Sequence, residues 1–193
     1  MHRHSRKFDP ERIAYLESEE RRAMLDPPKL LGRFGIQRGW TVADVGCGPG
    51  FFTFPLAEIV GAEGKVYGVD AEPRMIARLR ERIEGLRTEN VFAVHSTERA
   101  IPLPDGIVDF TLLSMVLHEL EGPSTLAEIG RILKNGGKLG VVDWEKKDEA
   151  IGPPRRIRLD RDEAAKMLRA AGFDPGSPLE ITPSHYGFMA GKR

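Results

Sequence analysis

The apolar positions of this chain follow two alternating patterns. Short continuous apolar runs predict buried strands at residues 40–45, 65–70, 91–94, 108–113 and 138–142. Apolar residues spaced three and four positions apart predict helices at residues 51–60, 73–84, 122–133 and 162–171. Because strands and helices alternate, we expect a parallel sheet with right-handed crossovers and helices on both faces.

The two ends of the chain carry other patterns. Helix start signals at Asp9–Pro10, Ser18 and Asp26–Pro27 predict two or three short helices before the sheet. Residues 179–182 and 186–190 are strand candidates that lie too close together for a helical crossover, so we expect them to pair antiparallel. The expected fold class is α/β: a Rossmann-like, doubly wound, mostly parallel seven-stranded sheet that ends in an antiparallel hairpin.

The length of 193 residues fits a single domain. We expect an N-terminal helical cap over residues 1–38, which either covers the sheet or closes over a ligand. The α/β core then occupies residues 39–193. The arginine-rich segment 152–161 is interpreted either as a flexible lid or as an ordinary surface loop.

Composition narrows the function classes. Lys+Arg and Asp+Glu both number 29, and the resulting net charge of zero disfavours nucleic acid as a partner. Cys47 is the only cysteine, so neither an internal disulfide nor a cysteine-based metal cluster is expected, and we predict no metal site. No apolar run approaches the ~20 residues of a membrane span, and the N-terminus lacks the apolar region of a secretory signal. These features predict a cytoplasmic protein and leave its oligomeric state open.

The strongest functional signal is a glycine loop after the first predicted strand, Asp44-x-Gly46-x-Gly48-x-Gly50. Glycines let the backbone turn sharply and approach a bound group closely. In open α/β sheets ligands bind at the carboxyl ends of the strands, where this loop is expected. The dinucleotide fingerprint would need a glycine at position 51, where this chain has Phe51. The loop therefore predicts a small-molecule site of another kind.

Asp70 ends the second predicted strand, 20 residues after Gly50. An acidic side chain at this place can accept hydrogen bonds from both ribose hydroxyls of an adenosine cofactor. The alternative is an aspartate that simply ends a strand before a turn. The spacing predicts an adenosine site without choosing the cofactor.

The glycine loop with Asp44 resembles the first motif of the class I S-adenosylmethionine (SAM) dependent methyltransferases. The antiparallel ending fits the fold of that family. The segment Val116–Leu120 resembles the Leu-His-His segment of its ubiquinone/menaquinone-biosynthesis (type 11) group. The resemblance implies SAM as cofactor, S-adenosyl-L-homocysteine (SAH) as product, and cofactor contacts from Asp44, Gly46, Cys47, Gly48 and Gly50.

The resemblance also implies cofactor contacts in later loops, at Asp70, Ala71, Met75, Ser96, Thr97, Glu98, Leu113 and Ser114. Ala71 and Met75 would lie along the adenine, although Met75 suits the core equally well. Glu98 would accept from the adenine amine, with help from one of the two polar residues before it. The backbone at the end of the fourth strand would contact the methionine part of SAM.

Three residues near the carboxyl ends of the fourth and fifth strands are candidates for the acceptor side: His118, Glu119 and Trp144. His118 is either a general base for an acceptor proton or a structural residue that holds its loop. Trp144 either lines the acceptor pocket or packs under the following loop. Methyl transfer needs alignment more than covalent help, so a missing nucleophile does not argue against catalysis.

We therefore expect a SAM-dependent methyltransferase that transfers a methyl group in line to a small-molecule acceptor. One alternative is a NAD-binding Rossmann oxidoreductase, which would ordinarily need a second domain for its substrate. The other alternative is a regulatory or sensor protein that binds SAM without turnover.

Overall fold

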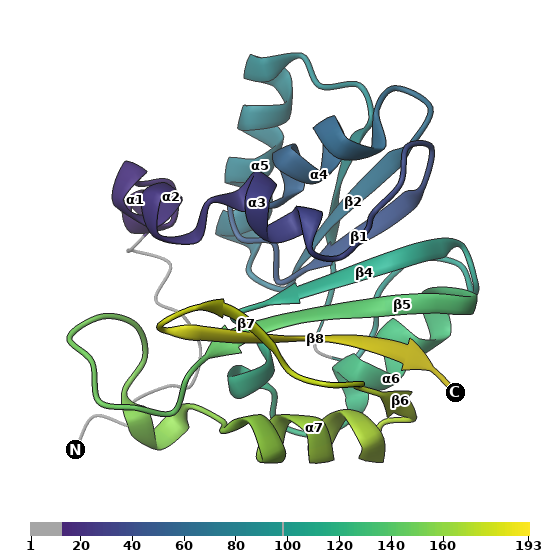
Figure 1. Cartoon of the computed structure of the whole chain (residues 1–193). Coiled ribbons are helices and arrows are strands. Elements are labelled where there is room, and N and C mark those ends of the chain that lie inside the picture. Colours follow the sequence, from purple (N-terminus) through teal and green to yellow (C-terminus); the bar gives the residue numbers. More distant parts are fainter. Residues whose placement is uncertain (1–12, 98) are drawn as a thin grey trace.

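The computed structural model describes residues 13–97 and 99–193 (Figure 1). The expected helix start at Asp9–Pro10 and the candidate Glu98 lie outside the described residues. The helices are α1 (Ile13–Leu16), α2 (Glu19–Leu25), α3 (Pro27–Gly32), α4 (Thr53–Val60), α5 (Pro73–Leu86), α6 (Ser124–Ile132) and α7 (Arg161–Ala170). The strands are β1 (Thr41–Val45), β2 (Lys65–Asp70), β3 (Val91–His95), β4 (Val108–Ser114), β5 (Leu133–Trp144), β6 (Phe173–Asp174), β7 (Leu179–Thr182) and β8 (His185–Lys192).

The sheet has the order β3-β2-β1-β4-β5-β8-β6, with β7 also paired to β8. The strands β1 to β5 run parallel to one another, and β8 is antiparallel to β5, β6 and β7. This confirms the mostly parallel sheet with an antiparallel C-terminal end. The sequence analysis did not predict β6. Because β5 occupies one edge of β8, β6 and β7 share the other edge, so eight strands fill seven positions.

The fifth strand begins earlier than the sequence indicated. The strand was expected at residues 138–142, but β5 starts at Leu133, which pairs with Val108. The next pair is Phe110 with Lys138, so residues 134–137 bulge opposite a single residue of β4. Gly136 permits this bulge because it has a φ of +77°.

Two side-chain caps explain where helices begin. Ser18 accepts from the backbone N–H of Arg21 at 3.2 Å and starts α2, as expected. The helix α7 is capped by Asp160, whose carboxylate accepts from the N–H of Glu163 at 2.8 Å, while Glu163 accepts from the N–H of Asp160. This capping box starts α7 just before the expected Asp162.

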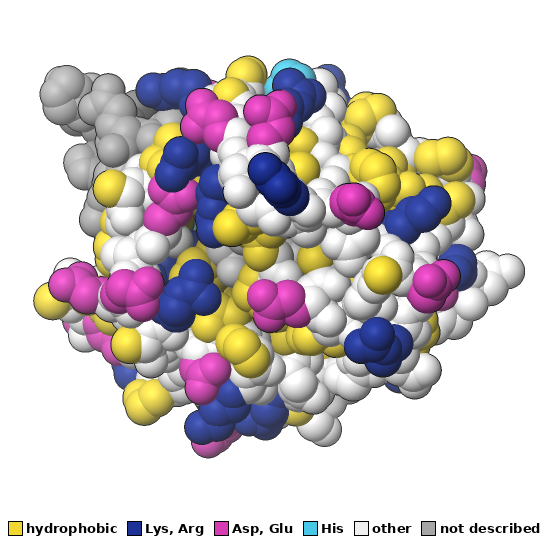
Figure 2. Space-filling view, turned by 90° about the horizontal axis from the view of Figure 1, so that it is seen from above, with side chains coloured by type: hydrophobic (Ala, Val, Ile, Leu, Met, Phe, Trp, Pro, Cys, Tyr) yellow, Lys and Arg dark blue, Asp and Glu magenta, His cyan; other side chains and the backbone are white. Residues whose placement is uncertain are grey.

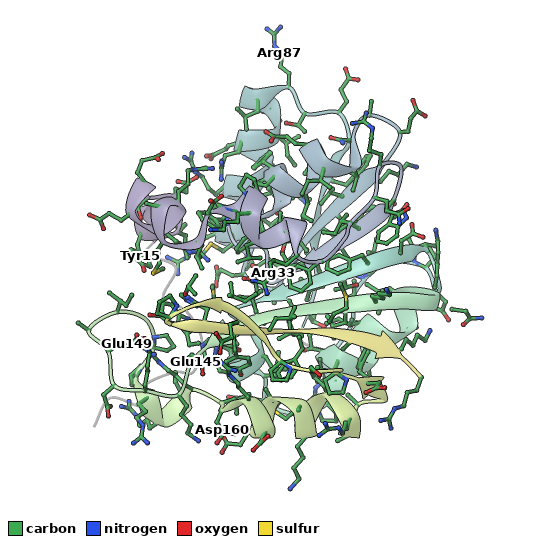
Figure 3. All side chains as sticks on the ribbon, viewed as in Figure 1. Tyr15, Arg33, Arg87, Glu145, Glu149 and Asp160 are labelled. Carbon is green, nitrogen blue, oxygen red and sulfur yellow. The ribbon has the colours of Figure 1, made fainter. Side chains whose placement is uncertain are left out.

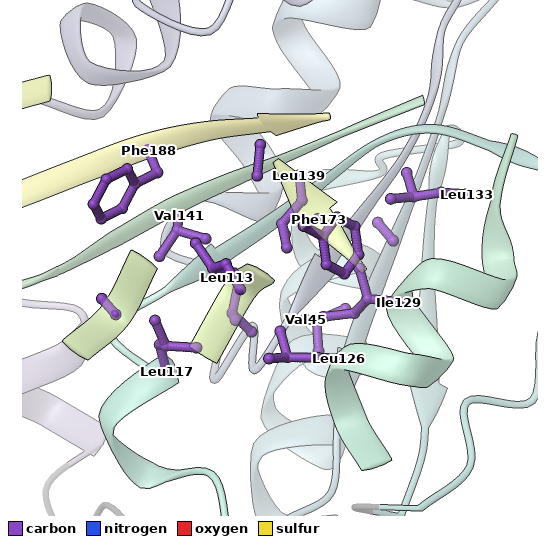
Figure 4. Close-up of a cluster of buried hydrophobic side chains, with 14 of the residues drawn as sticks. Val45, Leu113, Leu117, Leu126, Ile129, Leu133, Leu139, Val141, Phe173 and Phe188 are labelled. Carbon is purple, nitrogen blue, oxygen red and sulfur yellow. The ribbon is translucent and has the colours of Figure 1, made fainter. Parts of the chain in front are cut away.

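Two clusters of buried apolar residues cover opposite faces of the sheet. One cluster joins α6 and α7 to the sheet through residues such as Leu126, Ile129 and Leu113 (Figure 4). The other joins α3 and α4 to the sheet through residues that include Leu112. Since Leu112 and Leu113 are adjacent on β4, they point to opposite faces, as strand geometry requires. The doubly wound arrangement leaves the carboxyl edge of the sheet open for a site. Within the described residues, no helix is long and apolar enough to cross a membrane.

Candidate functional site

The glycine loop turns tightly at the end of β1. The N–H groups of Gly46 and Cys47 both donate to the carbonyl of Val69, at 2.8 and 3.1 Å. Gly46, Gly48 and Gly50 have φ values of +73°, +54° and +94°. A Cβ atom at position 46 would collide with the side chain of Val116. Glycine is thus required at position 46 both by the backbone conformation and by the close approach of the loop after β4.

Asp70 ties the glycine loop to the end of β2. One carboxylate oxygen accepts from the N–H of Gly48 at 2.8 Å, and the other accepts from the N–H of Glu72 at 2.9 Å. Burial raises the pKa of Asp70, although these two hydrogen bonds act to lower it. Each oxygen of an ionised carboxylate can accept a second hydrogen bond. Asp70 therefore anchors the loop and still has acceptor capacity toward the cavity.

A cavity of about 550 Å³ lies at the carboxyl ends of β1, β2 and β4. This volume is within the roughly 300–1,000 Å³ that is common for small-molecule sites. The predicted site residues that line this cavity are Gly46, Gly48, Asp70, Ala71, Met75, Ser96, Thr97, Ser114 and Glu119. The structure thus brings together residues that are widely separated in the sequence.

The other predicted site residues that the structure describes, Asp44, Cys47, Gly50, Leu113, His118 and Trp144, do not line the cavity. Cys47 is buried, and its thiol lies 3.4 Å from the carbonyl of Gly48. A Cβ atom at Gly50 would lie 2.7 Å from side-chain atoms of Leu79 and Phe54, so this glycine permits helix packing. Leu113 belongs to the apolar core.

Asp44 is a buried carboxyl group beneath the glycine loop. It accepts a hydrogen bond of 2.7 Å from the hydroxyl of Thr53. Burial is the main reason that the pKa of Asp44 is raised to about 7; the nearby Asp70 raises it further, whereas Thr53 and Arg21 lower it. Asp44 therefore changes its charge near neutral pH.

His118 forms a buried pair with Asp143 of β5. The backbone N–H of His118 donates to one carboxylate oxygen at 3.0 Å, and ring atom Nδ1 lies 2.7 Å from the other. Burial lowers the pKa of His118, but the Asp143 carboxylate outweighs this effect, so that the pKa is raised. Ring atom Nε2 lies 3.7 Å from Oε1 of Glu119, which does line the cavity.

Trp144 is packed beneath the loop that follows β5. Its ring centroid lies 4.2 Å from that of His185 and 5.0 Å from the guanidinium of Arg158. A Cβ atom at Gly152 would lie 2.8 Å from the Trp144 ring, so the loop backbone approaches the ring closely. These contacts agree with the packing alternative for Trp144.

The cavity wall also contains residues that the sequence analysis did not identify. Leu16 and Arg21 come from the N-terminal helices, while Met115, Val116 and Leu120 follow β4. In the sequence, Arg21 and its neighbour Arg22 look alike, and no local signal shows that only the first reaches the cavity.

Comparisons with known proteins identify the family. A family profile described as a methyltransferase domain matches residues 42–137. The crystal structure of a SAM-dependent methyltransferase from Aquifex aeolicus is 36% identical and has a TM-score of 0.93; the match covers 97% of this chain and 100% of that one. This chain belongs to the SAM-dependent methyltransferases. SAM is accordingly its cofactor, as the glycine loop indicated, and the NAD alternative is set aside.

Other relatives agree with this assignment. The structure of a putative type 11 methyltransferase from Sulfolobus solfataricus is 30% identical, with a TM-score of 0.64, and the match covers 79% of this chain and 83% of that one. The demethylmenaquinone methyltransferase of Geobacillus stearothermophilus is 28% identical over 83% of this chain and 81% of that enzyme. Matches to further demethylmenaquinone methyltransferases cover about half of those enzymes, 48% and 46%.

Proposed function

We propose that this methyltransferase acts on a small, largely apolar ring compound that binds next to the sulfur of SAM. The observation that carries this proposal is the composition of the cavity, which combines charged residues such as Arg21, Asp70 and Glu119 with an apolar wall. Leu16, Met115, Val116 and Leu120 form part of that wall. The relatives named demethylmenaquinone methyltransferases support a ring compound of this kind.

In this proposal Asp70 accepts hydrogen bonds from the ribose hydroxyls, and Ala71 and Met75 lie along the adenine. Ser96 and Thr97 line the cavity and would lie beside the adenine, and Glu98 would accept from the adenine amine. The backbone of residues 113–114 contacts the methionine part. SAM supplies an activated methyl group on a positively charged sulfur, and the chain aligns it with the acceptor.

The His118–Asp143 pair has a proposed role in removing a proton from the acceptor. Asp143 holds the Nδ1 side of the ring at 2.7 Å, which leaves Nε2 toward Glu119. Glu119 lines the cavity and is the group that would meet the acceptor. A proton accepted by Glu119 can then pass to the imidazole, whose pKa Asp143 raises. This assigns His118 an indirect role rather than contact with the acceptor.

The proposed setting is the cytoplasm, with no nucleic acid as partner. Figure 2 shows acidic and basic side chains interspersed on one face of the molecule, without a continuous basic surface there. The formal net charge of zero fits this distribution.

The proposal is tested by measuring SAH formation with purified protein and several acceptor classes: reduced demethylmenaquinone, a catechol, an alkylamine and a short RNA. We expect SAH formation with the quinol alone. The His118→Asn variant should retain its affinity for SAH and lose about 10²- to 10⁴-fold in turnover, the usual contribution of proton transfer.

Different outcomes separate the alternatives. Turnover of the amine or the RNA but not of the quinol contradicts the proposed acceptor. Tight SAH binding without turnover of any acceptor favours the sensor alternative. If His118→Asn turns over at the parent rate, its pair with Asp143 is structural, as the other interpretation of this histidine holds.

A further inference from the structure

Arg21 is a charged side chain that extends from the N-terminal helices to the cavity wall. Its guanidinium lies over the ring of Phe51, 4.2 Å from the ring centroid. One terminal nitrogen donates to the carbonyl of Leu16 at 3.1 Å, and the other lies 3.7 Å from the sulfur of Met115. A thioether is a weak acceptor, so this second contact satisfies the guanidinium poorly.

The described residues do not supply a carboxylate within ion-pair distance of Arg21, whereas Arg78 and Arg82 of the neighbouring helix α5 both pair with Glu17. Asp44 acts on Arg21 only through space and is itself partly neutralised by its raised pKa. Burial lowers the pKa of Arg21 to about 10, so the group is still charged at neutral pH. A partly desolvated cation with unused N–H donors is unfavourable unless an anion meets it.

The position of Arg21 relative to Asp70 indicates which anion this is. Asp70 ends β2, and Met115 follows β4, with β1 between the two strands. Neighbouring strands lie about 4.8 Å apart, so the two residues mark opposite ends of a site roughly 10 Å wide. A cofactor whose ribose lies at Asp70 extends across the glycine loop toward β4. Its amino-acid end, which carries the α-carboxylate, then lies on the side of Arg21.

We propose that Arg21 binds the α-carboxylate of the cofactor and makes the N-terminal helices part of the cofactor site. This inference rests on the proposed placement of the ribose at Asp70. The guanidinium is suited to a carboxylate because it can donate two parallel hydrogen bonds. Phe51 holds the guanidinium plane from one face. Glu17, just before α2, forms ion pairs with Arg78 at 3.1 Å and with Arg82 at 3.6 Å, both on α5. These ion pairs hold the helix that carries Arg21 in place.

The test compares two ligands by calorimetry: SAH, and 5′-methylthioadenosine, which has the same nucleoside and sulfur but no amino-acid part. In the Arg21→Met variant we expect the affinity for SAH to fall about 10- to 150-fold, as for loss of hydrogen bonds to a charged group. The affinity for 5′-methylthioadenosine should stay within twofold of the parent. Arg22→Met is the matched control, because Arg22 is more exposed and pairs with Glu19; it should leave both affinities unchanged.

A second measurement, hydrogen exchange, reports on α2 itself. SAH should slow hydrogen exchange of the α2 amides in the parent, whereas 5′-methylthioadenosine should not, because only SAH reaches Arg21. If Arg21→Met does not fold, Arg21→Lys replaces it. This variant keeps the charge but lacks the two parallel N–H donors of a guanidinium, so we expect a smaller loss of affinity, and only for SAH.

The inference is overturned if an Arg21 variant weakens both ligands equally, if it weakens neither, or if the parent binds SAH no more tightly than 5′-methylthioadenosine. A different result would show that the ribose does not lie at Asp70. In that case Asp70→Asn binds 5′-methylthioadenosine as tightly as the parent, whatever the Arg21 variants do.

Discussion

At the scale of single residues, Asp44 shows how a buried acid can lie beneath the glycine loop without touching the cavity. Its carboxyl group accepts from Thr53 at 2.7 Å and lies close enough to Asp70 and Arg21 for each to affect its pKa. Buried carboxylates are costly unless they are paired or protonated. The raised pKa of about 7 means that protonation provides part of the compensation.

This pKa predicts how stability depends on pH. Because the folded-state pKa of about 7 exceeds the ordinary aspartate value of 3.8, the native state binds this proton more tightly than the unfolded state. The contribution of Asp44 to the free energy of unfolding therefore falls as pH rises from about 4 to about 7. Asp44→Asn removes this slope, so relative to the parent the variant should gain roughly 2–4 kcal/mol between pH 4 and pH 8.

The measurement is urea unfolding of parent and variant at several pH values. Asp148→Asn is the control, since the Asp148 side chain is 89% exposed, and it should follow the parent at every pH. Parallel curves for the parent and Asp44→Asn would show that Asp44 titrates normally.

At the scale of elements, the loop between β5 and α7 is organised by one buried arginine. Arg158 donates to the carbonyls of Pro153, Glu145 and Ile151 at 2.8, 3.0 and 2.6 Å, and to the carboxylate of Glu149 at 2.8 Å. Figure 3 shows Glu145 and Glu149 around this loop and Asp160 at the start of α7. Such a network favours a fixed surface loop over the flexible lid that the arginine-rich sequence also allowed.

Arg158→Met should destabilise the protein by about 3–5 kcal/mol, because it leaves Glu149 and three carbonyls without their buried partner. Hydrogen exchange should speed up first in residues 145–157. Arg156→Met is the matched control, because Arg156 is exposed, and its effect should stay within about 0.5 kcal/mol. Equal effects of the two substitutions would mean that the network contributes little to stability.

At the scale of the whole molecule, the cavity proposed as the cofactor site lies at the ends of three parallel strands, so a ligand bound there would be coupled to folding of the sheet. A ligand at 100 times its dissociation constant stabilises the native state by about 2.7 kcal/mol. For a chain of this length, each kcal/mol raises the melting temperature by about 2–4 °C.

We therefore expect SAH at 100 times its dissociation constant to raise the melting temperature by about 5–10 °C, and NAD at the same concentration to leave it unchanged. At that fixed SAH concentration, Asp70→Asn should show a clearly smaller shift, because the variant loses the charged ribose acceptor. Differential scanning calorimetry of both proteins measures these shifts. A shift with NAD, or an undiminished SAH shift in Asp70→Asn, would contradict the cofactor placement.

The sequence alone determined the architecture and the cofactor. Five apolar runs predicted the parallel strands, and Lys65–Asp70 was placed with its observed bounds. The glycine loop and Asp70 were found because tight turns and strand ends have local sequence signals. Their spacing predicted an adenosine site, and the resemblance carried by the glycine motif predicted SAM, which the family confirms.

Only the tertiary structure decided which polar side chains meet. Arg21 and Arg22, or Arg156 and Arg158, are indistinguishable by local pattern, yet one of each pair enters the protein. His118 and Asp143 are 25 residues apart and meet because β4 and β5 are neighbours. The edge shared by β6 and β7 likewise follows from the position of β8. A local sequence pattern shows which secondary structure a segment prefers and which of its side chains face the core. Which side chains meet across the sheet depends on how the elements pack, and no short stretch of sequence encodes this packing.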